Sequence, residues 1–376
     1  MDPPAVESNR QTGGAPRTQD GGGKPLSRTP CLPAAFKAAA VLVVVLVFCR
    51  ASALAAAPLE FAPLGDFPLE NGGHIIDCTV AYRTYGTLNA ERSNAVLMLT
   101  WFGGRSDHLE GHIGTDRYVD SERYFVIAVD AFANGHSSSP SNSTAQPDDA
   151  FPEFSVRDLV EAQHRLLTEH LRIDRLHAVI GTSMGGMQAL QWLVSYPDFM
   201  RKAVAVAATP QLTSYDLLLW RLQQEALRTA IEGNGDAAAA MRLAGGLHLR
   251  ALTTPEDLNA RWDCAGFETE FRSRTESYAN RHPHDWDRQL SAMMRHDIYE
   301  SFAGDIAETA AAVSAEVLVV ISGRDHMVHP GPARDFARHL GCVLVELHND
   351  GGHLAADREA FLVRSVVRAF LDNETP

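Results

Sequence analysis

Short apolar segments alternate along this chain with segments of helical periodicity. Seven segments rich in Val, Ile, Leu and Ala predict β-strands: residues 78–86, 95–102, 124–132, 176–181, 202–209, 316–322 and 342–348. Several contain long continuous apolar runs, as expected for parallel strands that are buried on both faces. Because helical segments separate the strands, the pattern predicts a doubly wound, mostly parallel α/β sheet.

Four helices are predicted between these strands. Ser155 and Asp158 form a capping-box start, which apolar residues follow at helical spacing: Leu159, Val160, Leu166, Leu167 and Leu171. The other three are expected over residues 184–195, 332–340 and 358–371.

One long interval contains helical patterns and no convincing strand. It covers residues 211–304 and interrupts a core formed by residues 58–210 and 305–376. We interpret it as a helical lid inserted into the sheet domain. A separate small helical domain is the alternative.

The first 57 residues differ from the rest of the chain. Residues 1–30 are rich in Gly, Pro, Ser, Thr and Arg, a composition typical of disorder. Lys37 then precedes the apolar run 38–49, and small residues follow Arg50, as in a secretory signal peptide covering about residues 31–57. We therefore expect a secreted or periplasmic protein without stable membrane association after cleavage. An uncleaved N-terminal membrane anchor is the alternative.

Composition and charge restrict the classes of partner. The chain is 45% hydrophobic, which is sufficient for a large core, and its formal net charge of −14 repels phosphate backbones. We therefore expect no nucleic-acid partner. Beyond the signal segment, Cys78, Cys264 and Cys342 lack metal-site spacing, and the pair His282 and His284 lacks further spaced ligands. Neither a metal nor a cofactor is expected.

The segment VIGTSMGGMQAL carries the clearest chemical signal. Ser183 stands between Gly181 and Gly185, where a predicted strand passes directly into a predicted helix. Such a turn projects the serine hydroxyl above the sheet edge, and bulky side chains at either glycine would collide across it. We predict that Ser183 is a nucleophile and that the N–H of Met184 stabilises an oxyanion.

A serine hydroxyl is a weak nucleophile that needs a base and an acid to orient the base. On a sheet of this type the acid and then the histidine follow the serine along the chain. Asp325 follows the predicted strand 316–322, and His353 follows the next strand. Their positions favour them over nearby acids and histidines, which are Asp350, Asp357, His326, His329 and His348. Phe102, which precedes two glycines, is predicted to supply the second oxyanion N–H.

At this point the residues resemble a known family, the homoserine O-acetyltransferase branch of the α/β-hydrolases. The resemblance extends over about residues 70–371 and is strongest in VAYRTYGTLNAERSNAVLML, FPEFSVRDLVEAQHRLL, GTSMGGMQALQW and VSYPDFM. It implies the α/β-hydrolase fold with a helical lid, a triad of Ser183, Asp325 and His353, and an acyl-enzyme intermediate. It also implies that Arg228, in EALRTAI, binds a substrate carboxylate. A structural ion pair of this arginine is the alternative.

Two departures from the acetyltransferases bear on the expected function. Those enzymes carry His-Ala-Leu-Thr-Gly where this chain has TWFGG (residues 100–104), and they carry an aspartate where Leu354 follows the histidine. Without that carboxylate, selection of an amino-acid acceptor is weakened. The segment ANGHSSSPSNS resembles instead hydrolase members of the branch.

We therefore expect an enzyme that hydrolyses a small ester or related acyl substrate through an acyl-enzyme. One alternative is an O-acyltransferase that moves an acyl group from an acyl-CoA to homoserine or a similar hydroxyl acceptor. The other is a non-catalytic binding protein on the same scaffold. Since relatives often dimerise, a homodimer is left open.

Overall fold

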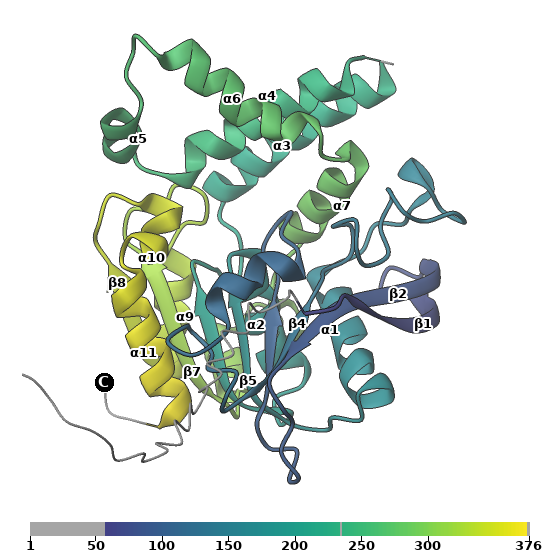
Figure 1. The fold of residues 1–376 in the computed structure, drawn as a ribbon, viewed down its shortest axis with the longest axis vertical. Coiled ribbons are helices and arrows are strands. Elements are labelled where there is room, and N and C mark those ends of the chain that lie inside the picture. Colours follow the sequence, from purple (N-terminus) through teal and green to yellow (C-terminus); the bar gives the residue numbers. More distant parts are fainter. Residues whose placement is uncertain (1–56, 234, 374–376) are drawn as a thin grey trace, which may run out of the picture. The chain divides into compact units, whose positions relative to one another are not determined.

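The computed structural model describes residues 57–233 and 235–373, so the predicted signal peptide lies outside the described residues. An eight-stranded sheet forms the centre of the fold (Figure 1), in the order β1-β2-β4-β3-β5-β6-β7-β8. The strands are β1 (Glu60–Pro68), β2 (His74–Tyr85), β3 (Ala95–Leu99), β4 (Phe125–Val129), β5 (Leu176–Thr182), β6 (Met200–Val206), β7 (Glu316–Ser322) and β8 (Val343–Leu347). The β1–β2 and β2–β4 pairs are antiparallel and the other pairs are parallel. The predicted mostly parallel sheet is confirmed.

All seven predicted strands are present, and one further strand was missed. β1 contains Pro63, Gly65 and Pro68, residues that normally weaken a strand, and it pairs with β2 through an irregular register. Because β1 is an edge strand, its prolines interrupt no second ladder of hydrogen bonds. The prediction for β3 was too long, because the chain leaves the sheet after Leu99.

The four helices predicted around the sheet are also present. They are α1 (Val156–Arg165), α2 (Met184–Ser195), α9 (Gly331–Leu340) and, for the last, α10 (Ala355–Arg358) together with α11 (Ala360–Asp372). Ser155 caps α1 as predicted, since its Oγ accepts a hydrogen bond from the N–H of Asp158 at 3.1 Å.

Two apolar layers cover the two faces of the sheet. Leu97 and Val179 belong to the cluster that contains apolar side chains of α1, α2 and α9. Their neighbours Val96 and Ile180 belong to a second cluster, which contains apolar side chains of α11. Successive residues of a strand point to opposite faces, so this alternation buries the central strands completely. Burying each such side chain contributes roughly 1.5–3 kcal/mol.

The first layer also contains a buried chain of polar contacts behind the start of α2. Trp192 Nε1 donates to Gln163 Oε1 at 2.8 Å, and Gln163 Nε2 donates to Gln188 Oε1 at 2.6 Å. Gln188 Nε2 in turn donates to the carbonyl of Thr100 at 3.1 Å. Because every polar group here has a partner, the chain stabilises one arrangement of α1, α2 and the end of β3.

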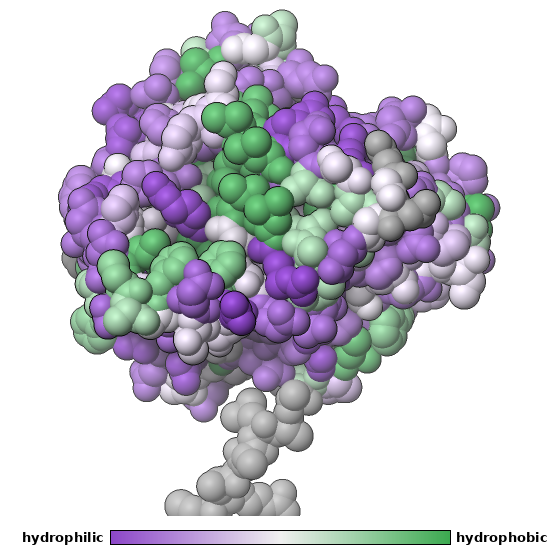
Figure 2. Space-filling view, turned by 90° about the horizontal axis from the view of Figure 1, so that it is seen from above, coloured by the Kyte–Doolittle hydropathy of each residue, from purple (hydrophilic) through white to green (hydrophobic). Residues whose placement is uncertain are grey.

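Among the described residues, five α-helices lie within the interval 211–304 that was predicted as a lid, and α8 (Ile306–Ala311) follows them before β7. The five helices are α3 (Ser214–Glu232), α4 (Ala237–Leu252), α5 (Pro255–Arg261), α6 (Phe267–Ala279) and α7 (Pro283–Met294). They gather at one end of the sheet (Figure 1). Seen from above, this end shows a band of apolar side chains among polar ones (Figure 2). Large exposed apolar side chains of these helices are Leu218, Leu222, Leu243, Phe267 and Phe271.

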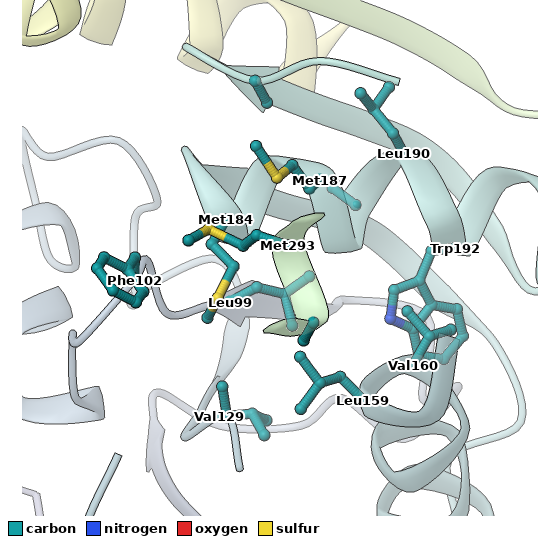
Figure 3. Packing of buried hydrophobic residues seen from close by; sticks show 14 of the residues in the cluster. Leu99, Phe102, Val129, Leu159, Val160, Met184, Met187, Leu190, Trp192 and Met293 are labelled. Atoms are coloured by element: carbon teal, nitrogen blue, oxygen red, sulfur yellow. The ribbon is translucent and has the colours of Figure 1, made fainter. Parts of the chain in front are cut away.

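Apolar packing continues from the sheet domain into these helices. Met293 of α7 belongs to the same buried cluster as Leu99, Met184 and Phe102 (Figure 3). A polar contact joins the two parts as well, because Asp216 Oδ1 at the start of α3 accepts from the N–H of His329 at 2.8 Å. The helices therefore pack onto the loops that follow the strands.

Two further observations concern the described residues as a whole. Cys78, Cys264 and Cys342 are free thiols, and burial raises the pKa of Cys78 to about 12. Within residues 57–233 and 235–373, no helix combines the length and apolar character needed to cross a membrane.

Candidate active site

The turn between β5 and α2 holds Ser183 in a strained conformation. Its φ of 56° and ψ of −123° lie outside the regions that residues with a side chain normally adopt. Such strain costs on the order of 1–3 kcal/mol and persists only where the surroundings hold it. Two backbone bonds do so here, because Ser183 N–H donates to Val206 O at 2.8 Å and Met187 N–H donates to Ser183 O at 2.9 Å.

The glycines around Ser183 allow three backbone segments to approach closely. A Cβ atom at Gly181 would lie 2.0 Å from the carbonyl oxygen of Gly185. At Gly185 it would lie 2.4 Å from the carbonyl oxygen of Leu99, and at Gly186 it would lie 2.5 Å from Ala208 Cβ. These distances are shorter than van der Waals contact, so the sequence-based explanation of the glycines holds in the structure.

The structure brings together the three side chains predicted as a triad. His353 Nε2 lies 3.0 Å from Ser183 Oγ, and His353 Nδ1 lies 2.7 Å from Asp325 Oδ2. All three residues are buried, with exposed fractions of 7–8%. The hydroxyl, the imidazole and the carboxylate therefore form one continuous chain of hydrogen bonds.

The loop after β7 fixes the carboxylate of Asp325. Its Oδ1 accepts from the N–H groups of Met327 at 2.8 Å and Val328 at 2.9 Å, which leaves Oδ2 directed at the imidazole. The rival Asp350 pairs instead with Arg324. For His353, burial alone would lower the pKa, but the carboxylate of Asp325, together with the smaller effects of Asp357 and Asp216, raises the pKa above the ordinary value.

The two predicted oxyanion donors remain available for a substrate. Among the described residues, no hydrogen-bond acceptor engages the backbone N–H of Met184 or that of Phe102. The neighbouring N–H of Gly103 donates to Gln289 Oε1 at 2.8 Å, and Gln289 Nε2 donates to Phe132 O at 2.8 Å. Gln289 of α7 thereby anchors the loop that carries Phe102.

Ser183 and His353 face a cavity of about 310 Å³ between the sheet edge and the lid helices. Five of its wall residues are aromatic: Trp101, Phe102, Tyr118, Tyr278 and Trp286. Leu252, Met327 and Leu354 add aliphatic surface. The wall also carries polar side chains, among them His248, Arg281 and Asp357, and a small cavity of apolar surface with convergent polar groups is typical of a small-molecule site.

Sequence analysis missed His248, which also lines this cavity. Its ring lies 5.5 Å from the ring of Trp286 and 5.6 Å from that of Phe102, and its buried Nδ1 has no hydrogen-bond partner within the part of the chain that the structure describes. Burial, with a smaller effect of His353, lowers the pKa of His248 to about 3, so the imidazole is neutral. A neutral imidazole can donate one hydrogen bond and accept one, so it presents a polar partner in an aromatic wall.

Arg228 does not reach the cavity. Its Nε lies 3.1 Å from Asp287 Oδ1 and one terminal nitrogen lies 3.5 Å from Glu153 Oε1. The expectation that it meets a substrate carboxylate is therefore not supported by its position, and the alternative of a structural ion pair describes it. The guanidinium that lines the cavity belongs to Arg281, which donates to the carbonyl of Gly103 at 2.9 Å.

One reason explains why the sequence analysis did not identify His248 and Arg281 as cavity residues. His248 and Arg281 lie in the lid interval, where helical periodicity shows that a residue is on a helix but not which helix face meets the cavity. A residue in the turn that follows a parallel strand, in contrast, has a known position at the sheet edge.

The histidines considered above for a metal form contacts with carboxylates. His282 lies 3.2 Å from Asp148, and His284 lies 2.9 Å from Asp149.

A strained serine between strand and helix, hydrogen-bonded to a histidine that a carboxylate orients, is the arrangement found in serine enzymes of acyl transfer. The protein-family model described as "alpha/beta hydrolase fold" matches residues 95–360. The chain therefore belongs to the α/β-hydrolase family of enzymes, and a relative that matches over most of both chains places it in the homoserine O-acetyltransferase-like branch.

Relatives in this branch include both hydrolases and transferases. The chain is 34% identical over 286 residues to an ethyl acetate hydrolase of Pseudomonas veronii, covering 71% of this chain and 81% of that protein. It is 36% identical to a probable esterase of Corynebacterium glutamicum, covering 57% of this chain and only 60% of that protein. A homoserine O-acetyltransferase of Clavibacter michiganensis subsp. michiganensis is 31% identical, over 78% and 87% of the two chains.

Solved structures confirm the fold. An acetylester hydrolase from Corynebacterium glutamicum superposes with a TM-score of 0.77 at 27% identity, over 83% of this chain and 96% of that one. A homoserine O-acetyltransferase from Bacillus anthracis gives the same TM-score at 24% identity, over 86% and 100%. The solved structures thus show the fold, and the relatives are of two kinds, esterases and acyltransferases.

Replacing Gly185 by Ala should damage both stability and activity. The new Cβ would press on the carbonyl of Leu99, so we expect a loss of about 1–3 kcal/mol of unfolding free energy. We also expect a roughly 100-fold lower kcat/KM, since the serine would be displaced. Thermal unfolding and ester turnover measure both effects. Gly111→Ala, where a Cβ meets nothing within 4 Å, is the matched control, and equal behaviour of the two variants would contradict the role of close packing.

Proposed function

We propose that this protein hydrolyses small esters in two steps through an acyl-enzyme on Ser183. The observation that carries the proposal is the hydrogen-bond chain from Ser183 through His353 to Asp325, which opens onto the apolar cavity. A charged substrate would lose hydration in such a cavity, whereas a short uncharged ester would gain apolar contacts.

In the first step, Ser183 Oγ forms a bond to the ester carbonyl carbon while His353 Nε2 takes the hydroxyl proton. The carbonyl oxygen becomes negative, and the N–H groups of Met184 and Phe102 stabilise it. When the carbon–oxygen bond to the alcohol breaks, His353 returns the proton to the departing alcohol. Asp325 keeps the imidazole oriented and stabilises its positive charge.

In the second step, water attacks the acyl carbon and gives a proton to His353. The bond to Ser183 Oγ then breaks, and His353 returns the proton to that oxygen. The products are the free acid and the regenerated serine. Water is the favoured acceptor because Leu354, which follows the histidine, presents an aliphatic side chain to the cavity. The ethyl acetate hydrolase and the acetylester hydrolase among the relatives support the same choice.

A second candidate is acyl transfer to an amino-acid hydroxyl. The observation in its favour is that Arg281 and Asp357 both line the cavity, so one cation and one carboxylate face the same space. Within the described residues, no carboxylate lies within ion-pair distance of Arg281. An acceptor that carries both charges would match this pair.

Product analysis separates the two candidates. We expect ethyl acetate to be consumed at the same rate with and without homoserine, with one acetate released per ester, because water reaches the acyl-enzyme. Ser183→Ala should show no turnover and is the control for background hydrolysis. Acetylated homoserine that forms at the expense of free acetate would contradict hydrolysis and support the transferase.

The pH dependence should report the protonation of His353. A protonated imidazole cannot accept the serine proton, so activity is present above the pKa of His353 and lost as pH falls through it. Because the Asp325 carboxylate raises that pKa, the acid limb of kcat/KM should lie above about 6.5, the ordinary histidine value. Asp325→Asn should move the limb to lower pH and reduce the rate about 10,000-fold.

Asp350→Asn is the matched control for that pH profile. Asp350 is closer to His353 in sequence than Asp325 is, but its carboxylate pairs with Arg324. We expect an unchanged acid limb in this variant. If the acid limb of kcat/KM shifts to another pH in Asp350→Asn, or keeps its pH in Asp325→Asn, the assignment of Asp325 as the orienting acid is contradicted.

A further inference from the structure

A second cavity adjoins the one that contains Ser183. It has a volume of about 260 Å³ and lies among α4, α5 and α6, and we call it the side chamber. Its wall is mostly apolar and includes Leu249, Leu258, Trp262, Phe267 and Phe271. The hydrolysis of short esters proposed above does not use this space.

Two leucines separate the side chamber from the catalytic cavity. Leu252 at the end of α4 and Leu354 next to His353 both line the two cavities. Leucine side chains change rotamer on fast timescales when space is available, so a partition of this kind is easily displaced by a ligand. No charged residue lines both cavities.

The loop that carries His353 packs directly on the end of α4. Gly352 has a φ of 60°, and a Cβ there would lie 2.9 Å from Thr253 Cα. Thr254 Oγ1 donates to the carbonyl of Asp350 at 2.6 Å. These contacts keep Leu354 against Leu252, so the chamber begins within one residue of the catalytic imidazole.

The wall chemistry indicates what the side chamber would hold. Phe267 and Phe271 are 45% and 40% exposed, a large amount of aromatic surface that an apolar ligand would cover. Three arginines line the chamber: Arg261 pairs with Asp257 at 2.7 Å, Arg274 pairs with Glu270 at 3.4 Å, and Arg250 is exposed to solvent at its rim. An apolar chain therefore fits the wall better than an anionic group.

We propose that the side chamber binds the unbranched apolar chain of a longer ester whose ester group lies at Ser183. This inference rests on the proposed ester hydrolysis and names its substrate class. The chain passes between Leu252 and Leu354 and displaces water from the aromatic wall. It belongs either to the acyl part or to the alcohol part of the ester, and both arrangements use the same contacts.

Two series of esters test the proposal. One series is alkyl acetates from ethyl to decyl, and the other is ethyl esters of acids from acetate to decanoate. Burying one methylene strengthens binding about fourfold, so kcat/KM should rise about fourfold per carbon in one series once the chain enters the side chamber. The series that shows the rise identifies the part of the ester that occupies the chamber.

Gly246 allows the side chamber to be filled without touching the catalytic cavity. It lines the chamber from α4, and a Cβ there would meet nothing nearer than Phe271 Cε2 at 3.7 Å. Gly246→Leu should lower the ratio of kcat/KM for the longest ester to that for ethyl acetate at least tenfold. Gly246→Ala is the matched control, because it makes the same helix more stable but leaves the space open, and its ratio should stay within twofold of the wild type.

The outcomes separate this inference from the proposed function. If ethyl acetate is hydrolysed but neither series rises with chain length, or if Gly246→Leu leaves the ratio unchanged, the side chamber does not bind substrate and the proposed function stands. If Gly246→Leu changes only the oligomeric state, measured by light scattering, a second copy covers the chamber and the inference is overturned. If no ester is hydrolysed at all, the proposed function itself fails.

Discussion

The active site depends on a close approach of backbone to backbone. The first turn of α2 lies against the ends of β3 and β6, at a distance that no side chain other than hydrogen permits at Gly181 and Gly185. This approach forces Ser183 into its positive φ and holds its hydroxyl above the sheet. The polar chain from Trp192 to the Thr100 carbonyl connects two of these elements, α2 and the end of β3, to α1. The packing of the central sheet thus stabilises the strained backbone conformation of Ser183.

The lid helices contribute as much to the site as the sheet does. Asp216 of α3 holds the loop that carries Asp325, and Gln289 of α7 holds the loop that carries Phe102. Thr254 at the start of α5 holds the loop that carries His353. Each of these three loops therefore has at least one polar anchor in the lid, in addition to the anchors within the sheet domain. Lid packing and catalytic geometry are coupled for this reason, and the size of the substrate space is set by the same helices.

The sequence predicted those parts of the molecule that local patterns determine. Segments rich in apolar and β-branched residues identified seven strands, and the spacing of Gly181, Ser183 and Gly185 identified the turn. Asp325 and His353 could be chosen because the end of a parallel strand has a known place at the sheet edge. β1 was not predicted, because its prolines are tolerated only at an edge, and edge position follows from strand order. His248 and Arg281 were not predicted, because the orientation of a lid helix follows from its packing. The same limit explains why the direction of the Arg228 side chain was not predicted. The residue lies on a helix, as expected, but its guanidinium pairs with Asp287.

The central claim is that Ser183 carries the acyl group between the two steps. Rapid acid quenching during turnover of an acetate ester, followed by peptide mass spectrometry, measures this directly. The account predicts an added acetyl group on the peptide that contains Ser183, and no acetyl group on that peptide from Ser183→Ala. An acetyl group found reproducibly on another residue, together with continued turnover by Ser183→Ala, would contradict it.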